Sequence, residues 1–65
     1  MEPLLVTPTE AAALMRVSRS LLYGLLARGE VDSILVGRAR RIPVAALDRF
    51  IEARLAEHRD VAASA

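Results

Sequence analysis

The sequence predicts a small α+β domain, mostly helical, with a short sheet of two or three strands and the element order β-α-α-β-β-α. Three observations lead to this prediction. A tight turn near position 17 separates two short helical segments, two aliphatic runs flank Gly37, and an apolar stripe begins at position 44. The 65 residues allow one domain, 1–65. We expect an ordered core at about 4–59 and a frayed tail at 60–65.

The first two elements are a short strand and a capped helix. The apolar run 4–6 suits a small edge strand or an extended lead-in. The segment TPTE at 7–10 supplies a capping threonine, a proline at the first helical position and a glutamate three residues after the cap. The helix is expected to end near Met15. The residues expected to face the core are Ala11, Leu14 and Met15.

A second helix is expected between Ser18, a favourable N-cap, and Gly29, a typical C-terminal stop. Two short helices joined by so tight a turn form a helix-turn-helix. The buried stripe has i, i+3, i+4 spacing and consists of Leu22, Leu25 and Leu26. The outward face is mostly small or polar and carries Arg19, Ser20, Tyr23, Gly24 and Ala27, with Leu21 at its border.

A hairpin and a final helix complete the chain. The runs 33–36 and 41–42 predict two strands, and Gly37 relieves the turn between them. Pro43 ends the second strand, and the last helix is expected at about 44–58. Its buried stripe should contain Val44, Leu47, Phe50, Ile51 and Leu55.

Positive charge is concentrated in the middle of the chain. The formal net charge is only +1, but residues 16–41 carry +4, against −2 for 1–15 and −1 for 42–65. All nine cations are arginine, whose planar group suits bidentate contacts with phosphate or guanine. The alternative explanation for this preference of arginine over lysine is the codon usage of a GC-rich genome. The charge map favours a nucleic-acid partner for the middle segment.

Several classes of protein are not expected. The chain has no cysteine, so a disulfide framework or thiolate metal site is excluded. Its apolar runs are too short to span a membrane, and its start lacks the features of a signal peptide. His58 has no second ligand in range, and no nucleophile–base pair or phosphate-binding glycine loop is evident. We therefore expect a cytoplasmic, nucleoid-associated protein that is not an enzyme and has no metal, cofactor, small-molecule substrate or membrane partner.

Three motifs follow one another: V-S-R-S-x-x-Y in the second helix, A-R-G-E after it, and G-R-x-R-R-I-P in the hairpin. In this order and spacing, residues 4–51 resemble the small excisionase-type helix-turn-helix domains, relatives of the MerR winged helix. The resemblance implies a winged helix-turn-helix that binds double-stranded DNA. Family members of this size are often non-catalytic recombination directionality factors of phages and integrative plasmids. Several copies bind beside an attachment site, bend the DNA and help an integrase to excise the element.

Carried over by position, the resemblance implies two groups of DNA contacts. The recognition helix would use Ser18, Arg19, Ser20 and Tyr23, and the wing would use Arg38, Arg40 and Arg41. Ordinary surface roles are the alternative for each. Tyr23 can cover the edge of the core, and Arg41 can pair with Glu30 or Asp32. Arg19 opposes the helix dipole in the first turn, which an external anion would explain.

The chain departs from the family pattern at three positions. Gly24 stands where a basic residue is common, Arg16 replaces a frequent turn glycine, and Asp32 stands where proline is usual. Gly24 removes a side chain that could contact DNA, which predicts that the wing arginines contribute more affinity than the helix. Two other functions remain open: a small winged-helix transcriptional regulator, and a protein-interaction module without DNA binding.

Overall fold

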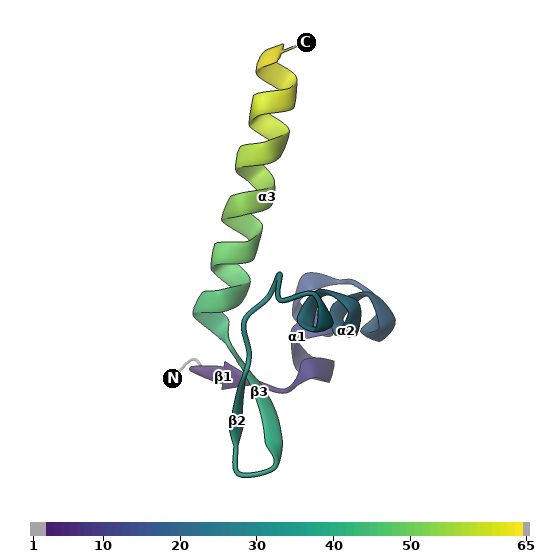
Figure 1. Cartoon of the computed structure of the whole chain (residues 1–65), viewed down its shortest axis with the longest axis vertical. Coiled ribbons are helices and arrows are strands. Elements are labelled where there is room, and N and C mark those ends of the chain that lie inside the picture. Colours follow the sequence, from purple (N-terminus) through teal and green to yellow (C-terminus); the bar gives the residue numbers. More distant parts are fainter. Residues whose placement is uncertain (1–2, 65) are drawn as a thin grey trace.

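A computed structural model describes residues 3–64, with side chains over 3–59. Its elements are β1 (Leu5–Val6), α1 (Pro8–Met15), α2 (Arg19–Ala27), β2 (Ile34–Val36), β3 (Ala39–Pro43) and α3 (Val44–Ser64). The predicted α+β class and element order are confirmed. Figure 1 shows the β2–β3 hairpin and α3 extending in opposite directions, with α1 and α2 grouped on one side between them. We call this hairpin the wing.

Both short helices begin with the predicted caps. At α1 the Thr7 hydroxyl accepts the Glu10 N–H at 3.1 Å, and the Thr7 N–H donates to the Glu10 carboxylate at 2.8 Å. At α2 the Ser18 hydroxyl accepts the Leu21 N–H at 3.1 Å. These bonds satisfy N–H groups that have no partner within the helix, so they fix where each helix begins.

Both short helices also end in the same way. The residue after the last turn adopts the left-handed conformation, with φ of 57° at Arg16 and 74° at Gly29. The following N–H then bonds back to a carbonyl of the last turn, at 3.0 Å from Val17 and 2.9 Å from Glu30. This arrangement satisfies carbonyls that the helix leaves unpaired. Glycine adopts this conformation without cost, whereas arginine does not.

The sheet has three antiparallel strands in the order β1-β3-β2. Val6 lies opposite Ile42 in one pair of strands, and Val36 lies opposite Ala39 in the other. The wing therefore closes with a two-residue turn whose first residue, Gly37, has a φ of 65°. That is the pattern of a type II′ hairpin, whose twist matches that of the strands.

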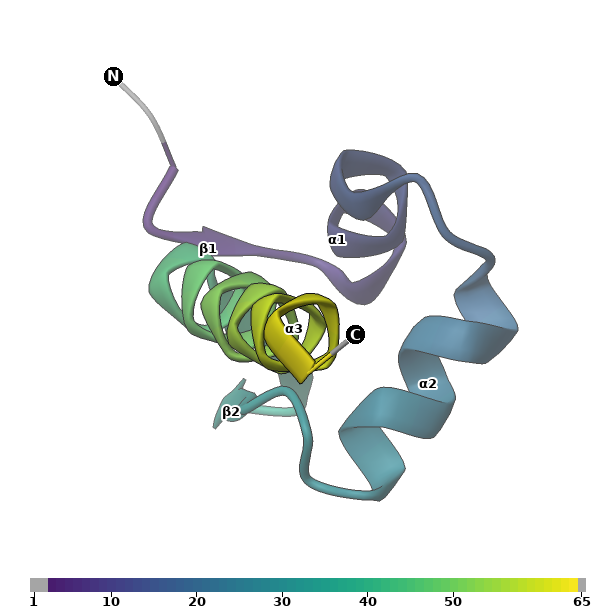
Figure 2. The same cartoon turned by 90° about the horizontal axis from the view of Figure 1, so that it is seen from above.

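The core lies where α1, α2, β3 and the start of α3 meet. Figure 2 shows α1 and α2 side by side on one flank of α3. The largest fully buried side chains are Leu22, Val31 and Ile42. The other buried members of the cluster are Val6, Ala11, Ala12, Leu25 and Leu47. One expectation about α1 is wrong: Leu14 is 64% exposed, and Ala12 is buried instead.

Only the first turns of α3 pack against the body. Ala46 and Leu47 are buried, while Ile51 and Leu55 are 43% and 42% exposed. The expectation that these last two face the core is wrong, because the helix has already left the body at their positions (Figure 1).

The backbone of α3 is helical to Ser64, beyond the expected end near 58. Fraying of 60–65 stays a prediction, and Ala65 lies outside the described residues. None of the described helices combines the length and apolarity needed to cross a membrane.

Candidate nucleic-acid interface

The start of α2 presents short polar side chains and one cation to solvent. Ser18, Arg19 and Ser20 are all exposed, and the first turn holds no acidic residue. Ser18 has a structural duty, because its oxygen caps the helix. Its hydroxyl proton is still available to a phosphate or base acceptor. Arg19 places a positive charge at the positive end of the helix dipole, where an anion would be stabilised.

The structure brings the recognition helix and the wing together at one open hollow. Its lining consists of Tyr23, Leu26 and Ala27 from α2 and Arg40 from the wing. Tyr23 is 46% exposed, so part of its side chain faces solvent. A hollow bordered by a phenol and a guanidinium can accept a phosphate oxygen.

The wing holds its arginines in different ways. Arg38 occupies the turn and is exposed. A guanidinium N–H of Arg40 donates to the Ser33 hydroxyl at 2.5 Å. Guanidinium has five N–H donors, so this bond orients Arg40 while leaving donors for a ligand.

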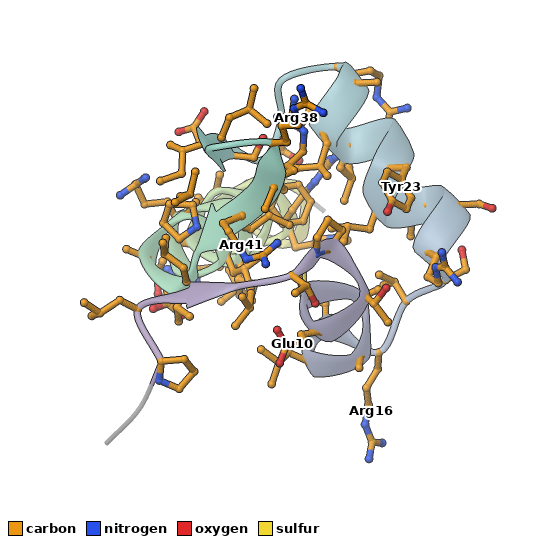
Figure 3. The ribbon with its side chains drawn as sticks, turned by 90° about the horizontal axis from the view of Figure 1, so that it is seen from below. Glu10, Arg16, Tyr23, Arg38 and Arg41 are labelled. Carbon is orange, nitrogen blue, oxygen red and sulfur yellow. The ribbon has the colours of Figure 1, made fainter. Side chains whose placement is uncertain are left out.

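Arg41 behaves differently from Arg40, as expected for neighbouring residues of one strand, whose side chains leave on opposite faces. It is half-buried, and one of its N–H groups donates to the carbonyl of Arg40 at 2.9 Å. Its charge acts on Glu10, whose pKa is lowered first by hydrogen bonds with Thr7 and additionally by Arg41. Figure 3 shows Arg41 directed from the wing towards α1, which carries Glu10.

Within the described side chains, the expected alternative partners of Arg41 are occupied elsewhere. Glu30 accepts from Arg28 at 2.6 Å and from Arg54 at 2.7 Å. Both cations lower its pKa, the hydrogen bond from Arg28 most strongly. Asp32 lies 3.7 Å from Arg49. The alternative in which Arg41 pairs with either acid is therefore wrong.

Cations and acids are segregated across the molecule. The ion pairs found among the described side chains join the end of α2, the following loop and α3. Arg54 also lies over the Phe50 ring, 5.1 Å from its centroid. Over residues 3–59, no carboxylate comes within ion-pair distance of five arginines, which are Arg16, Arg19, Arg38, Arg40 and Arg41. We call the exposed surface of α2 and the wing that carries Arg19, Arg38 and Arg40 the α2–wing face.

Arg16 was not among the predicted contacts. It projects into solvent from the turn before α2 (Figure 3). Two features of the sequence single out Arg16. It lies close to the Ser18 cap, and it occupies a turn position where the family often has glycine. Of the predicted contact residues, Arg41 is half-buried and the others are exposed, namely Ser18, Arg19, Ser20, Tyr23, Arg38 and Arg40. Three of them also make hydrogen bonds within the protein: Ser18, Arg40 and Arg41.

Comparison with known proteins gives a consistent family. Residues 5–55 match the family described as a helix-turn-helix domain. A protein from Streptomyces ambofaciens named as an excisionase is 38% identical over 55 residues, covering 85% of this chain and 89% of the relative. A Saccharopolyspora erythraea protein, also named as an excisionase, is 40% identical over 53 residues, covering 82% of this chain and 54% of the relative.

A Mycobacterium tuberculosis protein named as a DNA-binding protein is 42% identical over 48 residues, covering 74% of this chain and 62% of the relative. The chain thus spans about half of the Saccharopolyspora relative and less than two thirds of the mycobacterial one. No solved structure matches the chain.

Proposed function

Because the chain belongs to the family of excisionase-type helix-turn-helix proteins, we propose that it binds duplex DNA through its α2–wing face and directs integrase-mediated excision. The observation that supports this most strongly is the segregation of charge. Acids pair with Arg28, Arg49 and Arg54 around α3, whereas the arginines of the α2–wing face have no ion-pair partner among the described side chains. Such a face attracts a polyanion and gains counterion release on binding.

The proposed contacts follow from the shape of this face. The N-terminal end of α2 enters the major groove, with Arg19 and Ser20 nearest the base edges. Arg38 and Arg40 reach phosphates or the minor groove alongside, and Tyr23 closes the hollow between helix and wing. Ser18 and Arg41 contribute a hydroxyl and a charge from positions that the protein itself has fixed.

Base-specific contacts by α2 are few in this proposal. Gly24 offers no side chain, and the Arg28 guanidinium lies 3.2 Å from the position of a Cβ there. Arg28 is in turn held by Glu30 rather than directed into a groove. Affinity therefore depends mainly on the wing. Specificity depends on DNA shape and on neighbouring copies as much as on base edges.

Salt dependence tests the interface. Binding to a random-sequence duplex should weaken with salt, with a log–log slope of roughly −3 to −6 for several phosphate contacts. The double variant Arg38→Ala/Arg40→Ala should bind more weakly and with a flatter slope, because two cations of the wing are lost. Arg49→Ala/Arg59→Ala is the control, since it removes two exposed cations from α3. Equal losses for the wing and α3 variants would contradict the proposal.

The biological role needs a separate test. Excision of the integrated element should be compared with and without the protein, in the presence of the partner integrase, while a circularly permuted set of duplexes reports bending. Excision and bending that both depend on Arg38 and Arg40 are expected. DNA binding without any effect on excision would favour a transcriptional regulator. We retain this second candidate because one relative is named only as a DNA-binding protein. A salt-independent response would favour a protein-interaction module.

A further inference from the structure

The outer strand of the wing is an unprotected sheet edge. β2 lies at the end of the strand order β1-β3-β2, and Ile34, Leu35 and Val36 are 46%, 61% and 54% exposed. Edge strands usually carry a charge, a proline or a bulge that blocks further pairing. β2 is purely aliphatic. We infer that this edge pairs antiparallel with β2 of a second copy of the chain, joining two wings.

The hairpin geometry fixes the register of this pairing. Val36 and Ala39 close a two-residue turn, and such a closing pair exchanges both of its hydrogen bonds. Because successive residues alternate, the N–H and C=O of Leu35 face away from β3. Two copies therefore pair about Leu35, each Leu35 opposite the other and each Ile34 opposite the second copy's Val36.

Charge complementarity supports a second copy as the occupant. In this register Asp32 of each chain lies just beyond the end of its strand, on the side of the other chain's turn. That turn carries Arg38, whose guanidinium has donors for both a carboxylate and a phosphate. The Asp32 side chain is 75% exposed, and its ion pair with Arg49 is long, at 3.7 Å. A DNA phosphate would repel the Asp32 carboxylate, and the aliphatic side chains of β2 offer it no hydrogen-bond donor. A copy of the same edge matches both the apolar surface and the charges.

The β2–β2 contact is small, and its role in joining two copies rests on the proposed DNA binding. Strands of three residues bury too little surface for a stable dimer in free solution. Two copies bound at neighbouring DNA sites have a high effective concentration relative to each other. Even a weak contact between them therefore strengthens their binding to DNA. Because the pairing is two-fold symmetric, it joins copies on inverted neighbouring sites.

Cross-linking tests the contact without DNA. The chain has no cysteine, so single-cysteine variants report one position each. Paired residues of this kind have Cα atoms about 5.5 Å apart, within the range that a disulfide spans. Oxidised Leu35→Cys should form several-fold more covalent dimer than Leu14→Cys, a control of similar exposure on α1. A mixture of Ile34→Cys and Val36→Cys should favour the mixed dimer over either homodimer.

Charge reversal tests the register. Asp32→Arg and Arg38→Asp, each added to Leu35→Cys, should lower the dimer yield, and the combined reversal should restore it. Equal yields at positions 35 and 14, or no rescue by the combined reversal, would overturn the inference. Either result leaves salt-dependent binding of single copies to DNA intact if the proposed function holds. Conversely, cross-linking at Leu35 together with no salt-dependent DNA binding would support the β2–β2 contact and contradict the proposed function.

Discussion

At the scale of single residues, an arginine and a glycine reveal how local conformation and charge are combined. Arg16 and Gly29 occupy the same left-handed position after a helix. Only glycine adopts it without steric cost, which for other residues is about 1–2 kcal/mol. Arg16 adopts it nonetheless, and its side chain projects into solvent from the turn before α2 (Figure 3). We interpret this as backbone strain retained at a position that exposes a cation.

Arg16→Gly should therefore stabilise the fold. We expect a gain of about 0.5–1 kcal/mol, since the strain is relieved and part of the gain is lost to the greater freedom of glycine in the unfolded chain. Urea unfolding measures it. Arg16→Ala is the control, because it removes the charge and keeps the strain. Equal stability of the two variants would show that the left-handed conformation carries no cost here.

Acid should weaken the first helix through Glu10. Its pKa is lowered in the folded protein by the hydrogen bonds with Thr7, so its contribution is present above the ordinary glutamate pKa near 4.5. That contribution is lost as the pH falls through the lowered value. Thermal unfolding followed from pH 6 to pH 3 should show a smaller loss of Tm for Glu10→Gln than for the natural chain. Parallel curves for the two proteins would contradict this assignment.

At the scale of elements, the caps and the end of each short helix follow from nearby residues, and they were predicted correctly. Thr7, Ser18 and Gly29 act on groups only three residues away. Leu14 and Ile51 were placed wrongly for a different reason. Their spacing fits a buried stripe, but burial depends on whether another element reaches them. No periodicity within a helix contains that information.

Within α2, Gly24 weakens the helix without a steric reason. A Cβ at this position would meet only the flexible end of Arg28, at 3.2 Å. Gly24→Ala should stabilise the protein by about 0.5–1 kcal/mol, the difference in helix propensity. Gly29→Ala, measured alongside by the same unfolding method, should instead destabilise it, because φ is 74° there. A loss of stability in Gly24→Ala would show that the Arg28–Glu30 arrangement needs the glycine.

At the scale of the whole molecule, the shape and the charge point in the same direction. The wing projects from one end of the protein and α3 from the other, with α2 on one side between them (Figure 1). Acidic residues pair with Arg28, Arg49 and Arg54, so a net charge of only +1 is compatible with a cationic α2–wing face. The sequence predicted the cationic segment 16–41 from composition. It could not assign Glu30 to Arg54, because that contact joins residues far apart in the chain.

The most direct test of the central claim is an NMR titration of the labelled protein with a short duplex, followed through backbone amides. Binding through the α2–wing face predicts that the largest shift changes fall at residues 18–24 and 37–41. Amides at 52–59 of α3 should change little, and the changes should fade as salt is raised. The largest changes in α3, or no salt-sensitive changes in the wing, would contradict the account.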